Sequence, residues 1–179
     1  SQRSVMLHAL FTLTSGMPGL RTGQTIMPVV PMFHVNAWGL PYTAPITGLN
    51  LVMPGVKLDG PSLYDLLETE KVFSSWGVPT VWMGLLQEIE KRGARPAALG
   101  EVIIGGSAAP RAMIEAFETM GVSVVHGWGM TEMSPVGTLG VLATKDRDRL
   151  LAERIDLKCR QGRRMFGVEF DPVAWSARL

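Results

Sequence analysis

Residues 102–125 read VIIGGSAAPRAMIEAFETMGVSVV, and this stretch decides the fold. It opens with the apolar run Val102–Ile104, turns through two glycines and continues from Pro110 into a stretch with helical spacing. The apolar residues of that stretch are Met113, Ile114 and Phe117. Gly121 ends it, and a second apolar run follows at 122–125. Two mainly apolar strands joined by one helix are typical of a parallel sheet that is covered on both faces.

The same alternation continues on the N-terminal side. Further strands are predicted at 25–30, 49–53 and 72–76. Helices are predicted around 5–11, from Pro61 and from Pro79 onward, because proline is tolerated in a first helical turn. The fold class is therefore α/β, with a mostly parallel sheet flanked by helices and right-handed crossovers.

Two segments do not follow this pattern. Residues 36–46 are apolar, but Pro41 and Pro45 interrupt them, so any helix there is expected to be kinked. From about Lys145 the sequence becomes charged and irregular up to Arg164. We therefore divide the chain into an α/β portion, 1–144, and an irregular C-terminal segment, 145–179.

Composition excludes several classes of protein. Hydrophobic residues make up 46% and charged residues 18% of 179, which is typical of a globular interior rather than a disordered chain. A formal net charge of +1 gives no sign of a nucleic-acid partner. The single cysteine, Cys159, cannot form an internal disulfide, and no apolar run is long enough to span a bilayer. We expect a cytoplasmic protein.

Unusual residues follow four of the predicted strands. The segments are 31–34, 77–80, 105–108 and 126–132, and we interpret each as a turn. Since the carboxyl ends of parallel strands meet at one edge of the sheet, where open α/β sheets bind ligands, we expect these turns to converge there.

Each turn offers a specific chemistry. Gly105 and Gly106 allow the backbone to approach a flat ligand, and Trp128 could lie against a base. Thr131 offers a hydroxyl to a phosphate. Glu132 would repel a phosphate unless a hard cation such as Mg²⁺ lay between them.

Plainer interpretations stay open for the same residues. A glycine pair after a strand is most often only a turn, and Glu132 could cap a helix near Ser134. His34 and His126 are typical of structural histidines, and we assign His126 no role. The tryptophans at 38, 76 and 82 fit a core. An NAD-binding fingerprint beginning at Gly127 is disfavoured, because its third glycine would fall on Glu132.

Four motifs, in order, resemble segments of the adenylate-forming acyl-CoA synthetases. Residues 126–135, read HGWGMTEMSP, resemble the adenylate-binding motif of that family, and 31–39, read PMFHVNAWG, resemble the acid-pocket motif of its fatty-acid branch. Residues 77–80 and 105–108 resemble two further segments. The resemblance extends to about residue 170 and leaves a divergent tail at 171–179.

The resemblance implies roles for individual residues. The implied catalytic residues are Thr131, Glu132 and His34, with Glu132 as the Mg²⁺ ligand. The implied ATP- or AMP-binding residues are Gly105, Gly106, Ser107, Gly127, Trp128, Gly129, Met130 and Thr131. The implied acyl-binding residues are Phe33, His34, Trp38, Val78 and Gly129.

The resemblance also implies a reaction. ATP and Mg²⁺ would activate a carboxylic acid as the acyl-adenylate, and coenzyme A would take up the acyl group. The apolar character of Met32, Phe33, Trp38 and Val78 favours a medium- or long-chain fatty acid. Positioning and charge neutralisation, without a covalent nucleophile, would carry the catalysis.

The family's phosphate loop and its small C-terminal domain have no counterpart in this chain. We therefore expect a fragment of the large N-terminal domain that is inactive alone, with a frameshift or truncation as one hypothesis for the tail. Two alternatives remain: a non-catalytic nucleotide- or acyl-adenylate-binding module, which can be a degenerate gene product, and an NAD-binding domain.

Overall fold

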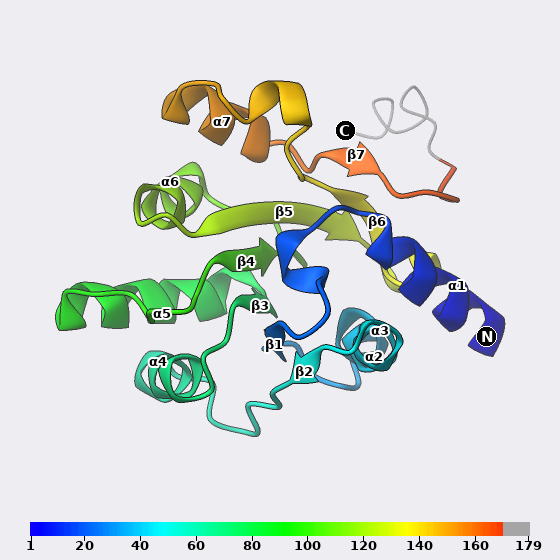
Figure 1. Cartoon of the computed structure of the whole chain (residues 1–179), viewed down its shortest axis with the longest axis horizontal. Helices are drawn as coiled ribbons and strands as arrows, with labels where there is room; N and C mark the ends of the chain where they lie inside the picture. The colour runs from blue at the N-terminus through cyan, green and yellow to red at the C-terminus, as the bar shows by residue number, and fades with distance from the viewer. Residues whose placement is uncertain (170–179) are drawn as a thin grey trace.

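The computed structural model describes residues 1–169, which form an α/β structure around one seven-stranded sheet (Figure 1). The strand order is β2-β1-β3-β4-β5-β6-β7. The first five strands in this order are parallel, and β6 and β7 are antiparallel to their neighbours. The predicted fold class is confirmed.

The parallel strands lie where the apolar runs predict them. They are β1 (Thr25–Pro28), β2 (Asn50–Leu51), β3 (Ser74–Gly77), β4 (Glu101–Ile104) and β5 (Ser123–Gly129). Alternate residues of each strand face opposite sides of the sheet. In β4, Val102 and Ile104 belong to one core cluster, and Ile103 between them belongs to the other.

Helices cover both faces, as Figure 1 shows. The first core cluster packs under α4 (Gly60–Thr69), α5 (Pro79–Arg92), α6 (Arg111–Thr119) and α7 (Leu151–Lys158). The second lies under η1 (Pro18–Leu20) and α3 (Leu40–Thr47). The first helix, α1 (Gln2–Leu13), packs against α3 on this second side.

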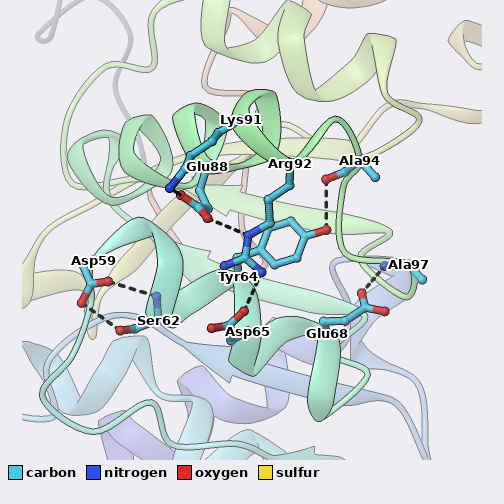
Figure 2. Close-up of polar contacts among 10 residues, drawn as sticks. All are labelled: Asp59, Ser62, Tyr64, Asp65, Glu68, Glu88, Lys91, Arg92, Ala94 and Ala97. Atoms are coloured by element: carbon cyan, nitrogen blue, oxygen red, sulfur yellow. Dashed lines mark hydrogen bonds and ion pairs between the residues drawn. The ribbon is translucent and has the colours of Figure 1, made fainter.

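The polar interface between α4 and α5 is shown in Figure 2. The Nε of Arg92 donates to Glu88 at 2.6 Å and its Nη1 to Asp65 at 2.6 Å, while its guanidinium lies 4.1 Å from the centre of the Tyr64 ring. The Tyr64 hydroxyl donates to the carbonyl of Ala94 at 3.1 Å. One arginine therefore ties both helices together.

The chain between β1 and α3 takes an unusual backbone path. Residues Val35–Trp38 form α2, and all four have φ between 48° and 55°. A left-handed turn of non-glycine residues costs roughly 1–2 kcal/mol per residue. Burial of Ala37 and Trp38 offsets part of that cost. The predicted kink at the prolines is not what the structure shows: α3 (Leu40–Thr47) contains both Pro41 and Pro45, and the break lies ahead of them, at Asn36 and Ala37.

Two predictions from sequence need correction. Residues 126–129 are not a turn: β5 continues through them and pairs with β6 (Val136–Leu139), which in turn pairs with β7 (Arg163–Arg164). The segment predicted to be irregular contains η3 (Thr144–Asp146) and α7, whose Ile155 is buried in the first core cluster while its Glu153 and Asp156 are exposed. The tail predicted to diverge, 171–179, lies outside the described residues.

No helix among residues 1–169 is both long enough and apolar enough to cross a membrane.

Candidate functional site

A cavity of about 300 Å³ opens at the carboxyl ends of β1, β3 and β4, beside the second half of β5. Segments that the sequence places far apart meet here, as the topology of a parallel sheet requires. The lining residues are His34, Val35, Trp38, Trp76, Ile103, Gly105, Gly106, Gly127, Trp128, Gly129, Met130, Thr131, Glu132, Pro135, Val136 and Leu139.

Glycine after β4 makes room for the protein's own aromatic ring. A Cβ on Gly105 would lie 3.1 Å from the Cη2 atom of Trp38, which is only 7% exposed. A Cβ on Gly106 would lie 3.0 Å from the Cγ1 atom of Val78, and its φ of +80° is a conformation that favours glycine. The indole of Trp38 therefore packs directly against the turn that closes one wall of the cavity.

The glycines of β5 admit β6 at close range. A Cβ on Gly129 would overlap the carbonyl oxygen of Pro135, and one on Gly127 would lie 3.1 Å from the Cδ2 atom of Leu139. The fold itself therefore requires glycine at position 129, in addition to the space for an acyl chain that the family resemblance implies. Residues 127–129 of β5, paired with β6, form a two-stranded wall of the cavity.

Trp128 is positioned by the same wall. A Cβ on Gly137 would lie 2.8 Å from Cζ3 of Trp128 and 2.9 Å from Cε of Met133. The indole therefore packs over Gly137 while it lines the cavity. Its partly buried ring offers an aromatic surface to a ligand.

The mouth of the cavity is polar. Thr131 and Glu132 lie in η2 (Thr131–Met133), both are exposed, and His34 is exposed on the β1 side. The lining contains no lysine or arginine, so Glu132 carries its formal negative charge without a cationic partner in the wall. No group of three or more potential metal ligands exists among residues 1–169. A single carboxylate fits Mg²⁺ only where phosphate oxygens and water complete its octahedral shell.

His8 lies outside the cavity lining and hydrogen-bonds to β6, one of the strands that form the cavity. Its Nε2 accepts a hydrogen bond from the backbone N–H of Val136 at 3.1 Å, and it also lies against Gly39. Burial lowers the pKa of His8 from 6.5 to about 4, so the ring is neutral at pH 7 and can accept this bond. It thereby links α1 to β6.

The structure brings most of the predicted residues together. Ten of them line the cavity: His34, Trp38, Gly105, Gly106, Gly127, Trp128, Gly129, Met130, Thr131 and Glu132. Phe33, Ser107 and Val78 do not, and the Phe33 side chain is 90% exposed. His126 has a structural role as expected, since its Nε2 accepts from the N–H of Ala109 at 3.2 Å.

Sequence reasoning missed several lining residues. Trp76 and Ile103 were assigned to the core or to strands, but they lie near the strand ends and also line the cavity. Their position near the strand ends was the available signal. Val136 and Leu139 come from β6, which the pattern did not predict, so no comparable signal pointed to them.

Comparison with known proteins adds three findings. The family of AMP-binding enzymes matches residues 2–172. A medium-chain-fatty-acid–CoA ligase of Ectopseudomonas oleovorans is 46% identical over 174 residues, which cover 97% of this chain and 32% of the ligase. A 3-methylmercaptopropionyl-CoA ligase of Ruegeria lacuscaerulensis is 45% identical over the same share of each chain. This chain spans about a third of the length of these relatives.

Among solved structures, the N-terminal domain of FACL13 from Mycobacterium tuberculosis superposes with a TM-score of 0.73 over 91% of this chain and 39% of that one. Its sequence identity is 22%, so this likeness shows the fold alone.

Proposed function

Because this chain belongs to the AMP-binding enzyme family, we propose that it forms part of an enzyme that activates a carboxylic acid with ATP and transfers the acyl group to coenzyme A. The names of the ligases it resembles support this reaction class. The chain contributes one wall of the site for the adenylate and the acid.

The observation that carries this proposal is the composition of the cavity. Its inner wall is apolar, with Trp38, Trp76 and Leu139, while Thr131 and Glu132 lie at the mouth. A molecule with an apolar tail and a phosphate-bearing head matches both parts, and a fatty acyl-adenylate is such a molecule.

The reaction takes place in two steps. An oxygen of the substrate carboxylate attacks the α-phosphorus of ATP, and the bond to pyrophosphate breaks. The thiol of coenzyme A then attacks the acyl carbon, loses its proton and displaces AMP. No side chain of the cavity needs to form a covalent bond, so these residues act by orienting the reactants.

The residues that line or border the cavity bind different parts of the nucleotide. Trp128 lies against the adenine, with Gly105, Gly106 and Ser107 on its other side and Gly127, Gly129 and Met130 along the strand. The Thr131 hydroxyl donates to the α-phosphate. When bound to Glu132, Mg²⁺ neutralises phosphate charge.

The acid lies toward β1. His34 borders its carboxylate, and Phe33 gates access from the exposed side. Trp38 and Gly129 contact the acyl chain, and Val78 packs behind Gly106 without lining the cavity. The apolar wall favours a medium- or long-chain fatty acid over a short one.

Binding of acyl-adenylate analogues tests this function. Isothermal titration of the purified chain should give the tightest binding for a non-hydrolysable octanoyl-adenylate, weaker binding for AMP and none for NAD. A matched analogue carrying a 3-methylmercaptopropionyl group separates the two substrate classes. Equal binding of AMP and both analogues would remove the fatty-acid specificity, and binding of NAD alone would overturn the proposal.

A further inference from the structure

A second cavity, of about 400 Å³, lies at the opposite edge of the sheet. It is formed around the start of β5, by the loop before β1, the loop after β6 and one side of α7. Cationic side chains gather in its wall: Arg21, Arg147, Arg154 and Lys158. Glu118 is the only carboxylate among its described lining residues. We call it the arginine cavity.

The single carboxylate, that of Glu118, already forms an ion pair with Lys158. The Nζ atom of Lys158, a residue that is 4% exposed, donates to Oε1 of Glu118 at 2.6 Å and to the hydroxyl of Ser123 at 3.0 Å. The same Oε1 accepts the backbone N–H of Val124 at 2.6 Å. Glu118 therefore neutralises Lys158 within a buried pair and leaves the arginines uncompensated.

None of the three arginines forms an ion pair with an acidic side chain in the described part of the chain. Arg21 and Arg147 form neither an ion pair nor a side-chain hydrogen bond with residues 1–169. The Nε of Arg154 is buried and has no acceptor among them. A buried donor without an acceptor destabilises the folded protein, and an anion in the cavity would supply that acceptor.

A further carboxylate, that of Glu101, lies near the cavity but is not part of its lining. Glu101 lies close enough to Lys158 and Arg21 to interact electrostatically, but its Oε1 accepts from the Ser74 hydroxyl at 2.8 Å and the Gly19 N–H at 3.2 Å. Burial raises the pKa of Glu101. Within residues 1–169, no hydrogen bond joins its carboxylate to the arginines.

We propose that the arginine cavity binds a small oxyanion of the phosphate class. Guanidinium groups match such an anion in geometry, because two parallel N–H donors can bond two of its oxygens. The site is separate from the candidate functional site, since the two cavities lie at opposite ends of the strands and share no lining residue.

Titration with inorganic phosphate and with pyrophosphate tests this assignment. Ionic strength is kept constant with sodium chloride, and affinity is measured by calorimetry. We expect saturable binding to the wild type that is at least about fivefold weaker in Arg154→Gln and in Arg147→Gln and undetectable in the double variant. Arg3→Gln, the same change on an exposed helical residue outside the cavity, should bind like the wild type.

Two results would overturn the proposal. One is the absence of saturable binding to the wild type, or equal affinity in all variants. The other is loss of phosphate binding in Thr131→Ala together with retention in the arginine variants, since the anion would then lie at the candidate site. Thermal melts confirm folding, and Arg147 is exposed, so its replacement leaves the core intact. Binding of the acyl-adenylate analogue should persist in Arg154→Gln, which separates this test from that of the proposed function.

Discussion

At the residue scale, the glycines of the candidate site are explained by neighbours that the sequence does not reveal. The sequence predicts that Gly105 lets the backbone approach a flat ligand, and that stays a prediction. The structure shows a close approach of another kind, by a side chain of the protein itself. The sequence could not indicate that the approaching group is the indole of Trp38, which comes from a distant segment. Likewise, glycine is required at 129 because of the close carbonyl of Pro135, which directly precedes the unpredicted strand β6.

Gly129→Ala should destabilise the protein by about 1–3 kcal/mol, because the added methyl group overlaps the Pro135 carbonyl oxygen and forces β5 and β6 apart. Chemical denaturation measures the change in the free energy of unfolding. Gly84→Ala is the matched control. Gly84 lies in α5, and its Cβ would meet only the backbone of Gly60 in α4, at 3.7 Å or more, so the change should be neutral or stabilising. Equal effects of the two changes would contradict the structure.

His8 should make stability depend on pH. Its pKa is lowered from 6.5 to about 4 in the folded protein, so between these values the unfolded chain binds more protons than the folded one. The contribution is therefore complete above pH 6.5 and is lost as pH falls toward 4. The shift corresponds to a loss of up to about 3 kcal/mol.

Denaturation curves at pH 7 and pH 4.5 measure this loss, with His8→Gln as the reference that cannot titrate. The pH-dependent loss should be smaller in His8→Gln. Identical losses in both proteins would show that other groups, such as His126 whose pKa is also lowered by burial, carry the whole effect.

At the element scale, periodicity predicted the parallel half of the sheet and failed for the antiparallel half. Strands of apolar residues between helices are readable because burial on both faces leaves no polar positions. The strand β6 contains Gly137 and Thr138, and β7 consists of two exposed arginines, so neither has an apolar pattern. Residues 126–129 contain two glycines, which have a low strand propensity, and they were predicted as a turn. Pairing with β6 keeps them extended.

The α4–α5 interface offers a test of element packing. Arg92→Ala removes two charged hydrogen bonds and the contact with the Tyr64 ring, and it leaves the buried Glu88 with fewer partners. We expect the melting temperature to fall by a few degrees. Lys91→Ala is the control, since its side chain is 75% exposed and lies 3.7 Å from Glu88, and it should change little. A larger effect of Lys91→Ala would contradict the described contacts.

At the scale of the whole molecule, several large apolar side chains are exposed on the surface of residues 1–169. On α1, Met6 is 47% and Leu10 is 46% exposed. Apolar residues lie on more than one side of this helix, and only one side packs against the rest of the protein. Such exposed residues favour association.

Purified alone, the chain should self-associate as its concentration rises, and the double variant Met6→Lys/Leu10→Glu should do so less. Sedimentation velocity across a concentration series measures this. A wild-type chain that remains monomeric at every concentration would contradict the prediction, whereas association that is unchanged in the variant would place the contact elsewhere.

The central claim is that residues from four separate segments form an adenylate site. The most direct test is thermal stabilisation of the purified chain by a non-hydrolysable fatty-acyl-adenylate analogue, in the wild type, in Trp128→Ala and in Phe166→Ala. Phe166 is 71% exposed and lies outside the cavity lining. We predict a rise in melting temperature that Trp128→Ala abolishes and Phe166→Ala preserves. No rise in a cooperatively folded wild type, or an equal rise in all three proteins, would contradict the claim.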